Sequence, residues 1–450
     1  MEDIQKIAAA SLEVLETIGV RLEHEEVRAR VLRAGARPGL TNEDVRFPRE
    51  MIEYCLASAP RSVSLGNVDG TATCLTPESE SVFWTCPVLH VWTGEERREV
   101  RSEDLIAISR LCNHLDNVHG VMGVALADVM PQHRDFVGVR IIAENSRKHV
   151  RALCFSGPGM EALAAMKPLL PGNWFSIGFT AHGPLRWTNL ALDVFLRSAG
   201  QGIPVTINGE PMAGVTAPVT VAGTAVVGNA EILAGIAVNQ VLEPGRPVIY
   251  NLGLAHVFDM KHATAITGGP ENALLARLSA ELGRFYQLPS SSWVSTESLF
   301  EDEQAALEKM LGFLTHVGSK VSLIWGMGQL ESEMTLSLAQ LVIDDEMVNV
   351  VRRYLRGFEV DNESISLETI RDVGISGSYL EHDHTFQNFR EHIYHPCLLN
   401  RAARNPQSKP LHQQAREKAQ ELLKEEEDSG ISPEISAELR KIEQHYRQKI

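Results

Sequence analysis

Two patterns of apolar and polar positions divide the chain. From Ile4 to Ile18 apolar side chains recur three or four positions apart, as on one face of an amphipathic helix. Further short helices are predicted over residues 25–32 and 49–58, and a glycine or proline follows each of them. Helices this short cannot enclose a core of their own, so we expect residues 1–80 to form a helical cap on a larger body.

From about residue 81, short apolar runs alternate with helical stretches. The predicted strands cover residues 118–124, 149–156, 174–180, 203–207, 248–252, 291–294 and 321–325, with a weaker run at 82–86 as an eighth. The predicted helices between them include residues 134–145, 189–199, 222–241, 270–286 and 301–317. This alternation indicates parallel βαβ units. No GxGxxG follows the first strand and no P-loop sequence occurs, so an α/β fold of the (β/α)8 TIM-barrel type over residues 81–400 is favoured over an open sheet.

The last part of the chain is dense in charge. Gly430 interrupts it, and Ser432-Pro433-Glu434 then predicts the start of a final amphipathic helix. We therefore expect residues 401–450 to form a charged helical extension. This extension packs on the barrel, packs on a second copy of the chain, or binds another partner.

Charge and cysteine usage narrow the class of protein. The chain carries 42 Lys and Arg against 58 Asp and Glu, a net charge of −16, which argues against nucleic acid or an anionic membrane as the main partner. No run approaches the roughly 20 apolar residues of a membrane span, and the acidic N-terminus does not resemble a secretory signal. The six cysteines form no CxxC pair. These features favour a cytoplasmic protein with free thiols.

In a barrel of this type, the reacting groups lie at the carboxyl ends of the strands and in the loops that follow. The polar residues at these positions are His182, residues 208–211, Asn251, His256, Asp259, residues 295–297 and residues 326–331. Gly326 and Gly328 allow the backbone to approach a ligand closely, so we assign them to cofactor binding. Gln329 and Glu331 of the same loop are the candidate catalytic residues.

Tryptophans also lie at or near the predicted strands and their ends. Trp84, Trp174, Trp187, Trp293 and Trp325 either pack in the core or form part of a pocket. With carboxylates nearby, such rings can bind an organic cation. The predicted substrate-binding residues are Trp84, Trp293, Trp325, Tyr250, Glu210, Glu231 and His384.

Metal and nucleophile chemistry has weaker support. His382-x-His384 and the pair Cys86 and His90 have spacings that can chelate zinc, but neither has a third ligand nearby, and no bound metal is expected. A helix cap is the alternative role for His384. The sequence contains no GxSxG, and Cys86 and Cys154 are better explained as core residues than as nucleophiles.

Several ordered segments carry a resemblance to a known family. They are LETIGV at 15–20, VRFP at 45–48, GIPV at 202–205, GVTAPVTVAG at 214–223, NAE at 229–231, PGRPV at 244–248, QLVIDDE at 340–346, HTF at 384–386 and PCLLNR at 396–401. On these segments the chain resembles the trimethylamine methyltransferase superfamily, specifically its members without pyrrolysine. The stretch at 259–262 departs from the family pattern, and the tail after Arg401 has no counterpart that we can place.

The resemblance implies a barrel that moves a methyl group from an amine to the cobalt(I) of a corrinoid. A separate small protein carries that corrinoid and docks over the barrel mouth, and no zinc is needed. The stretch that corresponds to the pyrrolysine position is 326–333, all ordinary residues, which argues against trimethylamine and favours a quaternary, betaine-like amine. The resemblance also favours a homo-oligomer.

The sequence leaves two other functions open. The first is corrinoid-independent methyl transfer to a folate-like acceptor. The second is a non-catalytic protein that binds quaternary ammonium solutes.

Overall fold

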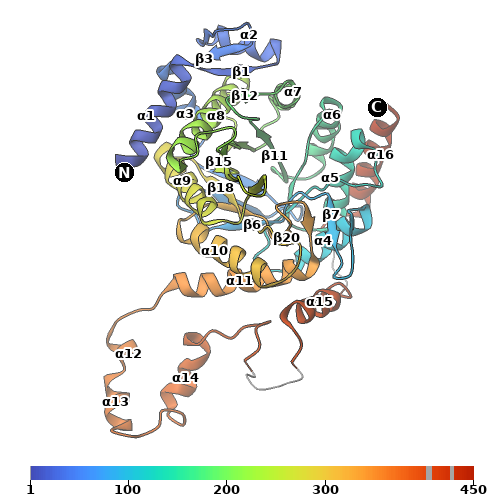
Figure 1. The fold of residues 1–450 in the computed structure, drawn as a ribbon. Coiled ribbons are helices and arrows are strands. Elements are labelled where there is room, and N and C mark those ends of the chain that lie inside the picture. Colours follow the sequence, from blue (N-terminus) through green and yellow to red (C-terminus); the bar gives the residue numbers. More distant parts are fainter. Residues whose placement is uncertain (1, 402–407, 426–429, 450) are drawn as a thin grey trace.

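The computed structural model describes residues 2–401, 408–425 and 430–449, and its centre is a closed barrel of eight parallel strands (Figure 1). In order around the barrel the strands are β10 (His149–Arg151), β11 (Phe175–Thr180), β13 (Val205–Asn208), β15 (Val248–Gly253), β18 (Ser290–Trp293), β19 (Leu323–Trp325), β6 (Val82–Trp84) and β9 (Gly120–Met122). The predicted barrel is confirmed. The weak eighth run is β6, which closes the barrel because it pairs in parallel with both β19 and β9.

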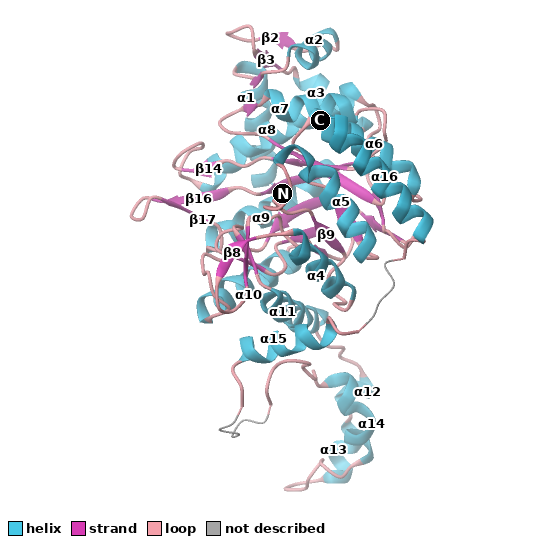
Figure 2. Ribbon diagram, turned by 90° about the vertical axis from the view of Figure 1, so that its right-hand side faces the viewer, coloured by secondary structure: helices cyan, strands magenta, loops and turns pink. Residues whose placement is uncertain are grey.

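Helices surround the strands (Figure 2). They are α4 (Ser102–Asn113), α5 (Arg134–Asn145), α6 (Gly157–Met166), α7 (Asn189–Ser198), α8 (Val221–Leu242), α9 (Pro270–Tyr286), α10 (Glu303–Gly318) and α11 (Leu338–Arg356), with 3-10 turns at Pro131–His133 and Lys167–Leu169. Among the described residues, only α8 has the length and apolar character that could cross a membrane, and it is mostly buried in the protein. Both of its sides are covered, because it contacts β13 and β15 of the barrel as well as the N-terminal helices.

The N-terminal segment is helical only in part. It contains α1 (Glu2–Thr17), α2 (Glu25–Arg33) and α3 (Arg49–Ser58), and a hairpin of β4 (Val63–Gly66) and β5 (Ala72–Leu75). It also contributes β1 (Val20–Leu22), β2 (Arg37–Pro38) and β3 (Asp44–Arg46) to a sheet in which β1 pairs with β12 (Arg186–Trp187) from the barrel region. These strands have two to four residues, too few for an alternating pattern to show in the sequence.

Short strands also line the barrel mouth. The loops after β13 and β15 pair as β14 (Met212–Ala213), β16 (His256–Asp259) and β17 (Thr264–Ile266). The loops after β6 and β19 pair as β7 (His90–Trp92), β8 (Arg97–Glu99), β20 (Gln329–Leu330) and β21 (Thr335–Leu336). The loops that follow the strands are thereby joined into walls around the carboxyl ends of the barrel.

The C-terminal part leaves the barrel and returns to it. Helices α12 (Asn362–Ile365), α13 (Leu367–Val373) and α14 (Asp383–His392) form an arm that projects from the body (Figures 1 and 2). Apolar side chains exposed on this arm include Phe358, Ile365, Ile375, Leu380, Phe386 and Ile393. Helix α15 (Leu411–Leu422) then packs against α11, and α16 (Pro433–Lys449) packs against α5 and α6.

Candidate functional site

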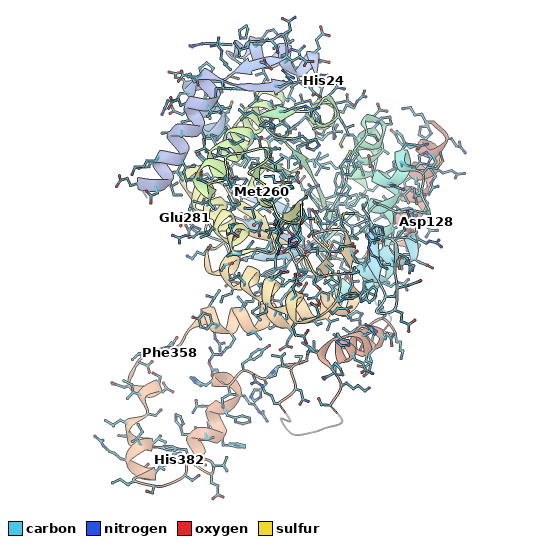
Figure 3. All side chains as sticks on the ribbon, in the orientation of Figure 1. His24, Asp128, Met260, Glu281, Phe358 and His382 are labelled. Carbon is cyan, nitrogen blue, oxygen red and sulfur yellow. The ribbon has the colours of Figure 1, made fainter. Side chains whose placement is uncertain are left out.

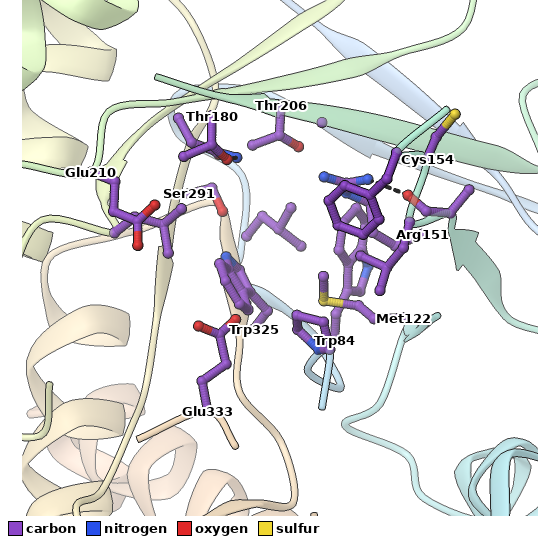
Figure 4. A pocket seen from close by; sticks show the side chains of 18 residues that line it. Trp84, Met122, Arg151, Cys154, Thr180, Thr206, Glu210, Ser291, Trp325 and Glu333 are labelled. Carbon is purple, nitrogen blue, oxygen red and sulfur yellow. Dashed lines mark hydrogen bonds between the residues drawn. The ribbon is translucent and has the colours of Figure 1, made fainter. Parts of the chain in front are cut away.

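A cavity of about 170 Å³ lies at the carboxyl end of the barrel (Figure 4). Six barrel strands each contribute their last residue to its lining: Trp84, Met122, Arg151, Thr180, Asn208 and Trp325. The loops add Phe155, Glu210 and Glu333. This is the position at which barrel enzymes of this architecture place their active sites.

Tryptophan rings form one wall of the cavity. The register pairs Trp293 with Trp325 and Trp325 with Trp84 on three adjacent strands, which places the three side chains at one level. Trp325 and Trp84 line the cavity, and Trp293 packs against Trp325 with 5.5 Å between ring centroids. Trp84 stacks on His149 at 5.2 Å, and burial lowers the pKa of that histidine to about 4, so its ring is neutral. The wall therefore presents aromatic faces without a nearby imidazolium, which suits a cationic ligand.

Carboxyl groups lie beside this aromatic wall. In Figure 4 the side chains of Glu210 and Glu333 lie on the same side of the cavity as Trp325. Burial raises the pKa of Glu210 to about 7, and burial together with the charge of Glu210 raises the pKa of Glu333 well above its usual value. Without a bound cation, Glu210 is therefore partly protonated near neutral pH, and Glu333 keeps its proton to a higher pH than an ordinary glutamic acid. A positive ligand favours their ionised forms.

Glu231 stands behind this pair, on helix α8. It is fully buried, and one of its carboxyl oxygens accepts a hydrogen bond from the Leu185 amide at 2.8 Å. The other oxygen has no hydrogen-bond partner in the described part of the chain. Burial and the charge of Glu210 raise the pKa of Glu231 to about 7. Glu231 does not line the cavity, but it interacts electrostatically with Glu210, which does.

The loop that carries Glu333 has an unusual backbone. Glu331, Ser332 and Glu333 have φ values of 54°, 49° and 76°, a left-handed region that costs free energy in residues other than glycine. Two main-chain hydrogen bonds hold this segment, from the Glu331 amide to the Ser298 carbonyl (2.7 Å) and from the Ser332 amide to the Thr296 carbonyl (2.8 Å). The strained segment delivers the Glu333 side chain to the cavity. In the sequence, Glu333 was only the last residue of the stretch 326–333.

A buried ion pair fixes the beginning of the same loop. The Lys309 ammonium lies 2.7 Å from the Asp344 carboxylate, and both side chains are fully buried. Lys309 also donates to the main-chain carbonyls of Gly326 and Gln329, each at 2.9 Å, while the Gly328 amide donates to Asp344 at 2.6 Å. Helices α10 and α11 are thereby tied to the strand end that carries Trp325.

Arg151 is the cationic group of the cavity. Its guanidinium donates to the Ala152 carbonyl at 2.6 Å, and it forms no ion pair with any carboxylate among the described residues. Burial lowers its pKa to about 10, so it stays charged at neutral pH. Room for it exists because residue 178 on the next strand is glycine, where a Cβ atom would lie 1.8 Å from Arg151 Nη2. Arg151 was not among the site residues predicted from the sequence, although a charge inside an apolar strand was the available signal.

The polar lining is only partly hydrogen bonded. The Asn208 amide donates to the Thr180 hydroxyl at 3.0 Å and accepts from the Asn251 amide at 2.9 Å. The hydroxyls of Thr206 and Ser291 line the cavity and have no partner among the described residues. They are free to bind a ligand or water.

Of the predicted substrate-binding residues, Trp84, Trp325 and Glu210 line the cavity, and Trp293 and Glu231 support them. Tyr250 and His384 lie elsewhere. The Tyr250 hydroxyl donates to Asn229 of α8 at 2.9 Å, because its ring points outward from β15. His384 belongs to α14 on the arm, far from the barrel, where Figure 3 labels His382, two residues earlier in the chain. Neither residue lines this cavity.

The predicted catalytic and cofactor-binding residues lie in the same loop as Glu333, a few positions before it in the chain. Glu331 is at the rim, and although burial raises its pKa, the Arg97 guanidinium, which donates to it at 2.7 Å, holds that pKa below the usual value. Gln329 is buried and bonds to the Ser295 hydroxyl at 3.0 Å. Gly326 has φ of 110°, and a Cβ there would lie 2.1 Å from the Val294 carbonyl oxygen. This glycine therefore lets the loop cross the neighbouring strand, and neither it nor Gly328 lines the cavity.

The described residues do not support the hypotheses of a metal site or a cysteine nucleophile. Among the described residues, no group of three or more His, Cys, Asp or Glu side chains could hold a metal ion. His382 caps α14, its ring accepting a hydrogen bond from the His384 amide at 3.0 Å. Burial raises the thiol pKa values of Cys86 and Cys154 well above the usual range, which disfavours the nucleophilic thiolate.

The chain belongs to the trimethylamine methyltransferase (MTTB) family, whose sequence model matches residues 1–449. The predicted family is confirmed. The match also includes the extension after Arg401, which corrects our expectation that this segment has no counterpart in the family. The protein is thus a member of a family of methylamine and betaine methyltransferases.

Two relatives and one solved structure illustrate the similarity. The trimethylamine methyltransferase MttB of Desulfitobacterium hafniense (strain DSM 10664 / DCB-2) is 29% identical over 468 residues, covering 98% of this chain and 92% of the relative. The glycine betaine methyltransferase of Desulfitobacterium hafniense (strain Y51) is 28% identical over 462 residues, covering 97% and 94%. The monomethylamine methyltransferase MtmB of Methanosarcina barkeri superposes with a TM-score of 0.56 at 14% identity, over 94% of this chain and 86% of that one. It has the same barrel fold.

Proposed function

We propose that this protein transfers a methyl group from a quaternary ammonium compound to the cobalt(I) of a corrinoid that a separate protein carries. The observation that supports this most directly is the cavity at the barrel mouth, in which Trp84 and Trp325 lie beside Glu210 and Glu333. Aromatic faces and carboxylates together bind cations that cannot donate hydrogen bonds. A quaternary nitrogen also needs no acid for its departure, because a neutral tertiary amine leaves with the electron pair of the broken C–N bond.

The rim of the cavity fits a partner that brings a large, flat acceptor. The loops after the barrel strands expose apolar side chains around the mouth, namely Leu89, Met130, Phe155, Val215, Val219 and Met260. Met260 is labelled in Figure 3, in front of the barrel. Exposed apolar groups of this kind mark interaction surfaces. The reduced corrinoid would supply the nucleophile that accepts the methyl group.

The residues of the chain would bind and orient the donor. Trp325 and Trp84 would contact the methyl groups on nitrogen, while Glu210 and Glu333 would balance the positive charge. A small, largely buried cavity also excludes water from the reacting carbon. Most of the rate enhancement would then come from holding one methyl group toward the mouth, in line with the acceptor.

The test is spectrophotometric. Purified protein is mixed with free cobalamin reduced to cobalt(I) and with a panel of trimethylated and dimethylated amines, and the conversion to methylcobalt(III) is followed. We expect conversion with at least one quaternary amine and none with the tertiary amines. If no amine supports conversion, with free cobalamin or with a corrinoid protein, the proposal is wrong. Methyl transfer to tetrahydrofolate without cobalt, or binding without transfer, would then identify the two alternatives.

Binding of a quaternary amine should release protons near neutral pH. Glu210 has a raised pKa of about 7, so below this pH it is neutral in the free protein, and a bound cation lowers its pKa and expels the proton. The affinity is therefore expected to increase as pH rises from about 6 to about 8, by up to about tenfold per pH unit for each proton released. Calorimetry in two buffers of different ionisation enthalpy measures this release.

The control ligand for this experiment is the uncharged carbon analogue of the amine, in which a tert-butyl group replaces trimethylammonium. It fills the same space and should release no protons. An apparent binding enthalpy for the amine that is identical in both buffers would show that the carboxyl groups do not titrate with binding.

A further inference from the structure

Two buried arginines of the barrel differ in their surroundings. Arg246 donates to the Ile203 carbonyl at 2.9 Å and to the Ser198 hydroxyl at 3.1 Å, and the Glu243 carboxylate lies 3.6 Å from it. Arg151 is also buried, but within the described part of the chain its only hydrogen bond is to the carbonyl of Ala152. A buried charge without a counter-charge is costly, so proteins normally pair it. The counter-charge for Arg151 is absent from the described part of the chain and can come from a ligand.

The position of Arg151 in the cavity indicates how the charges of a bound ligand would be arranged. In Figure 4 its guanidinium lies on one side of the cavity, while Glu210 and Glu333 lie on the other, with Trp325 on their side. One end of the small cavity thus carries a positive charge, and the other carries carboxyl groups whose ionised forms a bound cation favours. A zwitterion places its cationic end by the carboxyl groups and its anionic end by the guanidinium.

We propose that Arg151 binds the carboxylate of a zwitterionic substrate, so that the protein selects quaternary amines that carry an acid group over those that do not. This rests on the proposed function, since the cationic end of the substrate is the methyl donor. The guanidinium is suited to the role, because its planar donors bind a carboxylate through charge-assisted hydrogen bonds. The unpartnered hydroxyls of Thr206 and Ser291 add donors in the same cavity. Arg151 is then a residue that determines specificity and orientation, and it does not take part in bond breaking.

The test compares binding of three ligands, without any corrinoid, by calorimetry. They are trimethylammonioacetate, the matching alcohol choline, and 3,3-dimethylbutanoate, which keeps the carboxylate but has carbon in place of nitrogen. We expect the wild-type protein to bind both carboxylates, and Arg151→Gln to weaken their binding by about tenfold to hundredfold while choline is unaffected. Arg151→Lys should retain part of the preference, because it keeps the charge.

Two further variants separate this role from a loss of folding. Gly178→Ala places a methyl group against the Arg151 guanidinium and should weaken carboxylate binding although the charge is still present. Arg246→Gln removes an equally buried guanidinium outside the cavity and should leave the relative affinities unchanged. Thermal unfolding of each variant shows whether the barrel is intact.

The outcomes for the two proposals differ. Carboxylates that bind to wild-type protein no more tightly than to Arg151→Gln, or that do not bind at all, would overturn the role of Arg151. If methyl transfer from a quaternary amine is nevertheless observed, the proposed function stands without this anchor. If the effect of Arg151 is observed and transfer to a corrinoid is not, the carboxylate site stands and the proposed reaction fails.

Discussion

Replacing Lys309 by methionine is expected to lower the free energy of unfolding by about 3–5 kcal/mol, the usual cost of removing one partner of a buried ion pair. Methionine has a similar shape, so the loss comes from the charge and its hydrogen bonds. Asp344 would be left buried without its counter-charge, and the carbonyls of Gly326 and Gln329 would lose their donor. Urea unfolding followed by circular dichroism measures the change.

Two controls make this result specific. Lys6→Met removes an exposed lysine that pairs with Glu2 at 2.8 Å and should change the stability by less than about 1 kcal/mol. The double variant Lys309→Met/Asp344→Leu removes both charges, and we expect it to be less destabilised than the sum of the two single variants. A Lys309→Met protein as stable as the wild type would contradict the assigned role of the pair.

The sequence predicted the barrel well because its elements repeat. Each barrel strand is a short buried run and most helices between the strands are amphipathic stretches, so even the weak run at 82–86 was placed correctly as β6. The rule that active sites lie at strand ends then identified Trp84, Trp325 and Glu210, which do meet in the cavity. These residues were predictable because their positions follow from the order of strands alone.

The residues that the sequence missed depend on other information. Lys309 occupies one turn of an amphipathic helix and has the pattern of a surface lysine, since nothing in α10 shows that Asp344 of α11 will face it. Glu333 reaches the cavity through three left-handed residues, a backbone path without a sequence signature. Tyr250 was predicted to bind substrate, but only the tilt and stagger of the strands decide whether a given side chain points into the barrel or out of it. The periodicity of apolar positions therefore predicts helices and strands. The partners of buried charges can be identified only from the three-dimensional structure.

Trp325 was predicted from the sequence as a substrate-binding residue, and the loop that Lys309 holds in place follows it directly in the chain. It lines the cavity, packs on Trp293 and ends strand β19. Replacing Trp325 by alanine is expected to lower kcat/KM for a quaternary amine by about 100-fold, because a desolvated cation–π contact is worth about 2 kcal/mol and the ring also positions the methyl group. Steady-state methylation of cobalt(I) cobalamin measures kcat/KM, and calorimetry measures the affinity for the amine.

Further substitutions at position 325 separate the contribution of the aromatic ring from that of apolar volume. Trp325→Phe keeps an aromatic face and should lose only about tenfold, whereas Trp325→Leu has comparable apolar character without a ring and should resemble alanine. Trp174→Phe is the matched control, because Trp174 is buried just before β11, at the opposite end of its strand from the cavity, and donates to the Lys167 carbonyl at 2.9 Å. It should lower the stability and leave kcat/KM unchanged. If leucine at position 325 supports the same kcat/KM as phenylalanine, the ring does not bind the cation, and the contribution of Trp325 is that of apolar volume alone.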